Sequence, residues 1–170
     1  LKALEAREAR GEPLDRVASV ASTFVSRIDT AVDAKLEEAI AQRPERSAEL
    51  KALLGKAAVA NSKAVYQRFL DIFATERFQR LAAKGAHRQR PLWASTSTKN
   101  PAYPETLYVD ELIGADTVNT MPEATMNAFA EHGEVQETVT AGLEYWLGVL
   151  DGLADAGIDL DAVMQDLQDE

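Results

Sequence analysis

Residues 17–40 read VASVASTFVSRIDTAVDAKLEEAI, and the hydrophobic period changes within this one stretch. The first six residues, VASVAS, are small or apolar on both alternating faces, which is typical of a strand covered on both sides in a parallel sheet. From Ile28 to Ile40 apolar residues recur every four positions, as on one face of a helix. The stretch therefore predicts a strand at residues 17–22 that leads directly into a helix.

Two further segments carry a similar strand signal. They are residues 90–95, RPLWAS, and residues 116–121, DTVNTM, and helical patterns lie between the predicted strands. Strands that alternate with helices pair in parallel through right-handed crossovers, so an α/β fold is predicted. Three strands are fewer than the eight of a closed (β/α)8 barrel of ~250 residues. The alternatives are therefore part of a barrel or an all-helical bundle with three buried segments.

Helical spacing accounts for most of the remaining chain. The predicted helices cover residues 1–10, 45–54, 56–73 with 75–83 as an extension, 123–131, 135–156 and 160–167.

Composition excludes several functional classes. The chain has 170 residues, 46% hydrophobic and 27% charged, as in ordinary globular proteins. It has no cysteine, which removes disulfides, thiolate metal sites and thiol catalysis. No apolar run approaches the ~18 residues of a membrane helix, and the start does not resemble a signal peptide. We therefore expect a cytoplasmic protein with no membrane partner.

Charge is distributed unevenly along the chain. All 18 basic residues lie in residues 1–99, while residues 100–170 hold 16 acidic residues and no basic one. The acidic half keeps helical apolar spacing, so its acids are interpreted as the solvated faces of packed helices. The densest basic stretch, residues 77–90, lacks the interleaved aromatic residues of a base-stacking surface, and the net charge is -10. No nucleic-acid partner is therefore expected.

Hydroxyl side chains followed by one cation occur after two of the predicted strands. Ser22 and Arg27 follow the first strand, and Ser95 and Lys99 follow the second. In parallel α/β folds ligands bind at the carboxyl ends of the strands. Hydroxyls that donate hydrogen bonds beside a cation suit an anion such as a phosphate. These four residues are therefore the candidate phosphate ligands.

The position of Arg27 favours a bound anion, but it also has an alternative explanation. It falls in the first turn of its helix, where the helix dipole disfavours a cation, and no acidic residue lies at helical spacing from it. A bound anion would explain this position. The alternative is that Arg27 pairs with a distant acid, such as Asp29 or Glu105, and that the hydroxyls cap helices or form turns.

No metal or cofactor motif is found. His87 and His132 lie 45 residues apart, without the spacing of metal ligands. The acidic clusters lack the loop spacing of a calcium site, and no G-x-G-x-x-G is present.

Four segments together resemble the C-terminal part of bacterial transaldolases of the longer-chain type. They are VASVASTFVSRIDTAVD at 17–33, GKAAVANSKAVYQRF at 55–69, RPLWASTSTKNPAYPETLYVDELIG at 90–114 and DTVNTMPEATMNAFAEHG at 116–133. The resemblance covers most of the chain and depends on four blocks in the same order.

The resemblance implies that residues 1–170 are the C-terminal portion of a single class I aldolase-type (β/α)8 TIM-barrel domain. Such enzymes transfer a dihydroxyacetone unit between sugar phosphates in the pentose phosphate pathway, through a lysine Schiff base and without cofactor or metal. Ser22 and Arg27 match family residues at the sixth strand. Ser95 matches the phosphate-binding serine of the seventh strand, and Lys99 matches a nearby cation approximately.

The resemblance also implies that the catalytic groups lie outside this chain. In the family the Schiff-base lysine is on the fourth strand and the acid–base carboxylates are on earlier strands, whereas residue 1 is expected to lie within the helix before the sixth strand. A Schiff-base lysine is activated by desolvation. Lys56 and Lys63 are predicted among polar or small helical residues and Lys99 in a loop, so none is expected to replace it. The chain alone is expected to be inactive.

A second hypothesis needs no chemistry. Three strands leave sheet edges open, so the chain could be a catalytically silent half-barrel that self-associates or complements a missing N-terminal part. A helical scaffold without activity is the remaining alternative.

Overall fold

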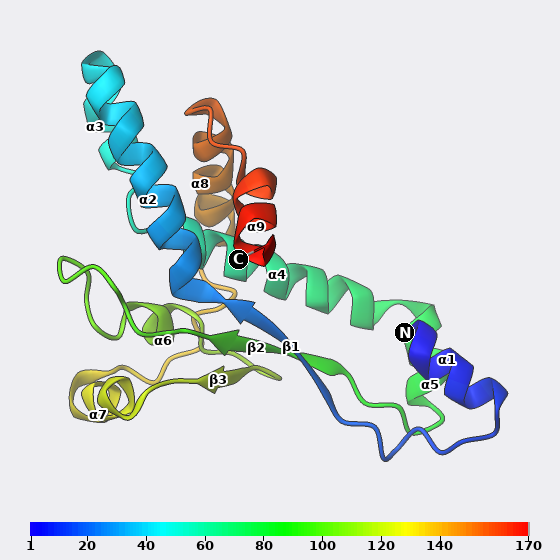
Figure 1. The fold of residues 1–170 in the computed structure, drawn as a ribbon. Coiled ribbons are helices and arrows are strands. Elements are labelled where there is room, and N and C mark those ends of the chain that lie inside the picture. The colour runs from blue at the N-terminus through cyan, green and yellow to red at the C-terminus, as the bar shows by residue number, and fades with distance from the viewer. Residues whose placement is uncertain (170) are drawn as a thin grey trace.

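The three predicted strands form one parallel sheet in the order β1-β2-β3 (Figure 1). The structure is a computed structural model that describes residues 1–169. The strands are β1 (Ser19–Phe24), β2 (Gln89–Ala94) and β3 (Val118–Thr120). The α/β prediction is confirmed, and the alternative of an all-helical bundle is wrong.

The helices alternate with these strands along the chain. They are α1 (Lys2–Ala9), α2 (Val25–Gln42), α3 (Ser47–Lys51), α4 (Ala57–Ala74), α5 (Glu76–Ala82), α6 (Leu107–Glu111), α7 (Glu123–His132), α8 (Leu143–Asp155) and α9 (Leu160–Asp169), with a 3₁₀ turn at Pro44–Arg46.

Two helix predictions are wrong. Residues 75–83 do not extend α4, because Thr75 leaves the helical conformation (φ -64°, ψ 146°) and its side chain accepts a bond from the Phe78 N–H, which starts α5. The predicted helix at 135–156 begins only at Leu143. The backbone before it instead bonds to another segment: the Thr138 and Val139 N–H groups both donate to the Ile113 carbonyl at 2.9 Å.

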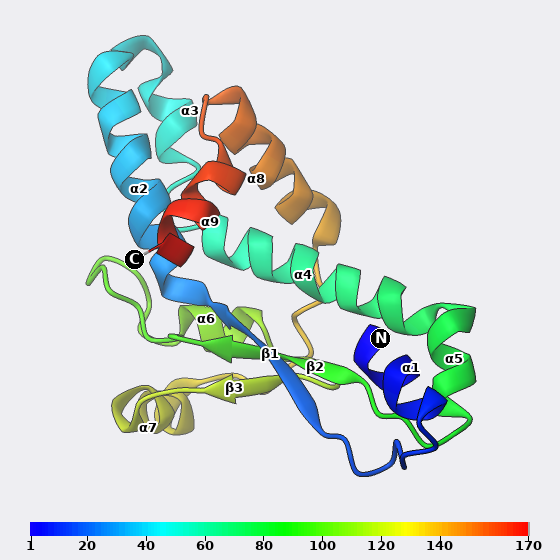
Figure 2. The same ribbon diagram turned by 45° about the vertical axis from the view of Figure 1, so that its right-hand side comes forward.

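The core lies between the sheet and the helices on one side of it (Figure 2). Trp93 of β2 points into this core, is 1% exposed and donates its indole N–H to the Leu112 carbonyl at 3.0 Å. On α2, Ile28, Val32 and Leu36 are buried, as the four-residue spacing predicts. Each such side chain contributes about 2 kcal/mol through burial. This packing fixes the first turn of α2 at the carboxyl end of β1.

Strand β1 is more exposed than its sequence predicts. Residues 17–22 are expected to be covered on both faces, yet five of the six residues of β1 are exposed. Among them, Val20 is 41% exposed and Phe24 is 52% exposed. The reason is that β1 pairs only with β2 and has no helix in front of it in either ribbon view. Residues 1–169 thus leave one edge and one face of β1 uncovered.

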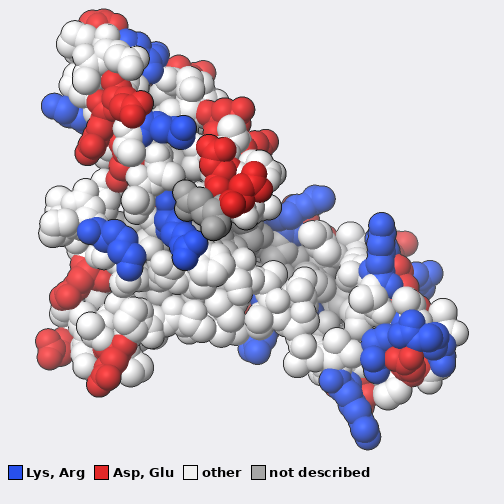
Figure 3. Space-filling view, in the orientation of Figure 1, with Lys and Arg blue, Asp and Glu red and all other residues white. Residues whose placement is uncertain are grey.

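Few charged side chains lie over the strands. Figure 3, in the orientation of Figure 1, shows a mostly uncharged surface in the middle of the molecule, with acidic side chains gathered on the helices above it. Among the described residues, no helix has both the length and the apolarity needed to cross a membrane.

Candidate functional site

A cavity of about 500 Å³ lies at the carboxyl end of β1 and is called the strand-end cavity below. Its walls include Ser22 and Phe24 of β1, Arg27 of α2, Asn61 of α4 and Met164 of α9. The sequence prediction names Ser22 and Arg27, and the structure brings both to this cavity. Asn61 was not predicted. Its Nδ2 atom is buried without a hydrogen-bond partner among residues 1–169, and such groups are uncommon.

Arg27 is exposed and forms no ion pair with residues 1–169. Its guanidinium lies 4.9 Å from the centre of the Phe24 ring. The two acids proposed as its partners are engaged elsewhere: Asp29 accepts bonds from Tyr108 and Ala58, and Glu105 pairs with His132 at 3.2 Å. The alternative that Arg27 pairs with Asp29 or Glu105 is therefore wrong.

Ser95 connects the end of β2 to the first turn of α2. Its Oγ lies 2.8 Å from Ser26 Oγ, and its carbonyl accepts the Ser26 N–H at 3.1 Å. Ser95 adopts φ +57°, a left-handed conformation that costs an ordinary side chain about 1 kcal/mol. Ser26 is adjacent to Arg27, so the contact brings Ser95 beside the turn that carries this cation.

Lys99 is placed apart from Ser22 and Arg27. Its Nζ donates to Ser97 Oγ at 3.0 Å. It lines a second cavity of about 230 Å³, together with Asp33 and Tyr103. The four candidate ligands therefore lie in three places: Ser22 and Arg27 at the strand-end cavity, Ser95 against α2, and Lys99 over the second cavity.

Four buried or half-buried side chains form what we call the Asp–Tyr cluster: Asp29, Asp33, Tyr103 and Tyr108. The Asp29 carboxylate accepts the Tyr108 hydroxyl at 2.7 Å and the Ala58 N–H at 2.8 Å. The Asp33 carboxylate, one turn further along α2, accepts the Tyr103 hydroxyl at 2.6 Å and the Gly55 N–H at 2.9 Å. The cluster thus joins α2 to the start of α4 and to the segment after β2.

Burial dominates the electrostatics of this cluster. It raises the pKa of Asp29 to about 6, against the opposing effect of the Ala58 and Tyr108 hydrogen bonds, and the charge of Asp33 adds to the rise. Burial raises the pKa of Tyr103 above its usual range, and the hydrogen bond to Asp33 adds to this rise. Burial and the charge of Asp29 likewise raise the pKa of Tyr108. Both tyrosines therefore stay protonated and act as donors.

Lys63 is buried, contrary to the prediction of a polar surrounding. It is 1% exposed, and its Nζ contacts Glu111 at 3.1 Å and the carbonyls of Thr138 and Ala141 at 2.8 and 3.0 Å. The Trp146 ring lies 5.2 Å away. A lysine held by a carboxylate and two carbonyls is a structural cation rather than a free amine. Lys63 remains excluded as a nucleophile, but for this reason and not through solvation.

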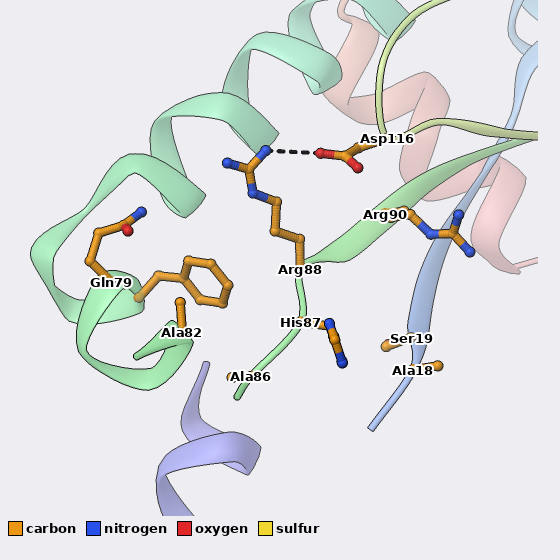
Figure 4. A pocket seen from close by; sticks show the side chains of 10 residues that line it. Ala18, Ser19, Gln79, Ala82, Ala86, His87, Arg88, Arg90 and Asp116 are labelled. Carbon is orange, nitrogen blue, oxygen red and sulfur yellow. Dashed lines mark hydrogen bonds and ion pairs between the residues drawn. The ribbon is translucent and has the colours of Figure 1, made fainter. Parts of the chain in front are cut away.

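A further cavity, of about 490 Å³, lies at the opposite, amino ends of β1 and β2 (Figure 4). In Figure 4 Arg88 points toward Asp116, with which it pairs at 2.9 Å, while Arg90 points toward β1. His87 Nε2 lies 3.0 Å from the Asp15 carbonyl. Within residues 1–169 no group of three metal-ligating side chains is found.

The two carboxylates of the Asp–Tyr cluster have a recognisable signal in the sequence. Asp29 and Asp33 lie one turn apart on the same side of α2 as the buried Ile28 and Val32. Acidic residues beside an apolar helical stripe indicate buried carboxylates that need donors. Asn61 has no comparable signal, because its surroundings depend on α9 and β1.

Known proteins resemble this chain along its whole length. The profile of the family "Transaldolase/Fructose-6-phosphate aldolase" matches residues 1–170. A protein named Transaldolase from Trichodesmium erythraeum (strain IMS101) is 46% identical over 171 residues, which cover 98% of this chain and 45% of the relative. Transaldolase 1 of Streptomyces avermitilis is 47% identical over 100% of this chain and 44% of the relative. A Transaldolase of Frankia alni is 50% identical over 93% of this chain and 41% of the relative.

The chain thus spans less than half the length of these curated relatives. The match to the family profile nevertheless includes every described strand and helix. The chain belongs to the transaldolase/fructose-6-phosphate aldolase family.

Proposed function

We propose that residues 1–170 are the C-terminal portion of the (β/α)8 barrel domain of a transaldolase. Parallel β1, β2 and β3, each followed by helices, agree with three consecutive units of such a barrel. The uncovered edge and face of β1 would then be completed by the remaining strands.

The complete protein would transfer a dihydroxyacetone unit between sugar phosphates. The observation that carries this proposal is the identity of 46–50% to proteins named transaldolase, over 93–100% of this chain. The Schiff-base lysine and the acid–base carboxylates would come from strands that have no counterpart in residues 1–170. No cofactor or metal is part of the proposed reaction.

In this proposal the present residues supply the phosphate end of the site. Ser22 and Arg27 at the strand-end cavity would bind the phosphate through a hydroxyl donor and a guanidinium. Ser95 would contribute from the end of β2. Lys99 would add positive charge from the adjacent loop rather than a direct contact, because its Nζ turns toward Ser97.

A catalytically silent, self-associating half-barrel is the second candidate. Its support is the exposed apolar surface of β1, where Val20 and Phe24 lie on an edge strand that pairs on one side only. In that case the chain would form dimers at micromolar concentration, with no sugar phosphate bound.

A graft tests the proposed activity. Residues 1–170 replace the matching segment of the Streptomyces avermitilis relative, and turnover of fructose 6-phosphate with an aldose phosphate acceptor is measured. We expect the graft to be active, and the chain alone to show neither turnover nor a borohydride-trapped adduct. Substitution Arg27→Ala in the graft should raise KM by about 100-fold, since a charge-assisted contact contributes about 2–3 kcal/mol. A folded but inactive graft, or borohydride labelling of the chain alone, would refute the proposal.

A further inference from the structure

The segment that follows β2 is attached to α2 at both of its ends. At its start, Ser95 contacts Ser26 through both side chain and backbone. Near its far end, the Tyr103 hydroxyl donates to Asp33, and the hydroxyl of Tyr108, in α6 directly after the segment, donates to Asp29. We call residues 95–106 the β2–α6 loop.

We propose that Asp29 and Asp33 are positioning residues that hold the β2–α6 loop, through Tyr108 and Tyr103, against the helix that carries Arg27. This inference rests on the proposed function, because it treats Arg27, Ser95 and Lys99 as the phosphate end of the site. None of the four cluster residues needs to touch the substrate. Their role is to fix the position of the loop, and of Lys99 within it, relative to Arg27.

The order of residues along α2 supports this role. Arg27 lies in the first turn, Asp29 follows two residues later and Asp33 one turn after that. A rigid helix therefore carries one phosphate ligand and both loop anchors. A loop fixed to this helix keeps Lys99 in a constant position relative to Arg27.

Tyr103 is fixed by its ring as well as by its hydroxyl. A Cβ atom built on Gly55 would lie 2.6 Å from the Tyr103 ring, so the ring rests directly on the backbone of this glycine. Gly55 adopts φ +68°, where a side chain would be strained. Asp33 binds both partners, accepting the Gly55 N–H and the Tyr103 hydroxyl. Tyr103 and Lys99 line the same cavity, so displacement of the ring alters the surroundings of the lysine.

The start of the loop is fixed independently of the cluster. Thr96 is fully buried, and its hydroxyl donates to the Asn119 side chain at 2.8 Å. Between the two attachment points, Lys99 donates to Ser97, and the Tyr103 N–H closes a turn onto the Asn100 carbonyl at 3.1 Å. The stretch between Thr96 and Tyr103 is thus the part whose placement depends on the cluster.

A suitable variant must release the β2–α6 loop without disturbing the start of α4. Asp29 and Asp33 also hold the start of α4, so their removal would disturb two features at once. Tyr103→Phe removes one hydroxyl and keeps the ring on Gly55, and Tyr103 is only half-buried. Tyr145→Phe is the matched control, because Tyr145 is 54% exposed on α8 and its hydroxyl binds only Lys56 among residues 1–169.

Amide hydrogen exchange of the isolated 170-residue chain tests the geometry without any activity. In Tyr103→Phe we expect the amides of residues 97–103 to exchange about tenfold faster, while those of α2 and α4 are unchanged. Tyr145→Phe should leave the loop as it is. Loop exchange equal to that of the unaltered chain would overturn the proposal, as would acceleration spread evenly over α2 and α4, which would indicate a general loss of stability.

The grafted enzyme supplies the second readout. Tyr103→Phe should raise KM for fructose 6-phosphate about tenfold and weaken inhibition by inorganic phosphate equally, with kcat changed by less than about twofold. Tyr145→Phe should change neither constant. A fall in kcat at constant KM would contradict a role in positioning the phosphate ligands. A folded graft that is inactive before any substitution would count against the proposed function alone, and the exchange measurement would still decide whether Tyr103 fixes the loop.

Discussion

The Asp–Tyr cluster and the strand-end cavity both include residues from the first turns of α2, but their polar side chains differ in whether they have hydrogen-bond partners. In the cluster, each carboxylate accepts one hydroxyl and one backbone N–H. At the strand-end cavity, Arg27 has only the Phe24 ring as a neighbour for its charge, and Asn61 Nδ2 has no partner among residues 1–169.

Polar side chains therefore have two different roles in the two regions. Buried polar groups that are fully hydrogen-bonded hold segments together, and any loss of a partner is costly. Polar groups that line a cavity without partners are available to a ligand. We therefore expect substitutions of the buried, hydrogen-bonded groups to lower the stability strongly. Substitutions at the strand-end cavity should weaken ligand binding without lowering the stability.

Lys63→Met is expected to have the largest effect. It would leave the carbonyls of Thr138 and Ala141 and the Glu111 carboxylate without their shared donor. Breaking a buried charge network costs about 3–5 kcal/mol of unfolding free energy, measured by urea denaturation. Lys35→Met, at an exposed position on α2, is the control and should change it by less than about 0.5 kcal/mol. A loss below about 1 kcal/mol for Lys63→Met would show that the contacts of this lysine do not stabilise the fold.

The pH dependence of stability tests the buried charge of Asp29. Its pKa is about 6 in the folded chain against an ordinary value of 3.8, so the folded state binds more protons between these values. The resulting stabilisation is complete below pH ~4 and is lost as the pH rises through ~6, a change of about 3 kcal/mol. The groups that face Asp29 are Asp33, Tyr108 and the Ala58 N–H, and the charge of Asp33 adds to the rise in the pKa of Asp29.

The variant Asp29→Asn isolates this contribution. The contributions of acidic groups that do not face Asp29 cancel in the difference in unfolding free energy between the unaltered chain and Asp29→Asn, which is measured by denaturation from pH 4 to pH 7.5. We expect this difference to shift by about 3 kcal/mol in favour of Asn as the pH rises. A difference that stays constant with pH would mean that burial does not raise the pKa of Asp29.

The sequence predicts the elements that bury one face better than it predicts long-range contacts. The hydrophobic period correctly predicts three strands, α2 and α4, because each of these elements buries one face and therefore repeats an apolar spacing. The predicted helix at 135–156 fails where the backbone of residues 138–141 bonds to Ile113 and to Lys63. Lys63 lies 75 residues from Thr138, and no local pattern records such a partner.

Exposure is the second property that the sequence predicts poorly. VASVAS is apolar on both faces, as a strand inside a complete barrel would be, while residues 1–169 cover only part of it. For the candidate site, Ser22, Arg27, Ser95 and Lys99 could be named from their positions at or after the ends of the predicted strands, although β1 continues to Phe24 and therefore contains Ser22. Their separation into three places could not, because it depends on Ser26, Ser97 and the path of the β2–α6 loop.

Tyr108→Phe tests the contribution of a single hydrogen bond within the cluster. The variant keeps the 1%-exposed ring and removes only the hydroxyl that donates to Asp29. A hydrogen bond to a buried charged group is worth about 2 kcal/mol, so the urea midpoint should fall accordingly. Tyr145→Phe, measured in parallel, should lie within about 0.5 kcal/mol of the unaltered chain because that hydroxyl is exposed. Equal values for the two variants would remove the distinction between the cluster and ordinary surface contacts.

Arg27→Ala should have the smallest effect on stability, and it tests directly whether the strand-end cavity binds an anion. The side chain is exposed, and its contact with Phe24 at 4.9 Å is worth about 0.5 kcal/mol at a surface position. Unfolding free energy should therefore barely change. Binding of inorganic phosphate, followed by shifts of the Ser22 and Ser95 amide signals on titration, should be lost, because the guanidinium supplies the charge at this end of β1. Lys35→Ala, equally exposed on α2, is the charge-matched control and should leave the titration unchanged. If Arg27→Ala destabilised the chain by 2 kcal/mol or more, Arg27 would have a structural role like the hydrogen-bonded groups of the Asp–Tyr cluster. The proposal that the strand-end cavity binds an anion would then be wrong.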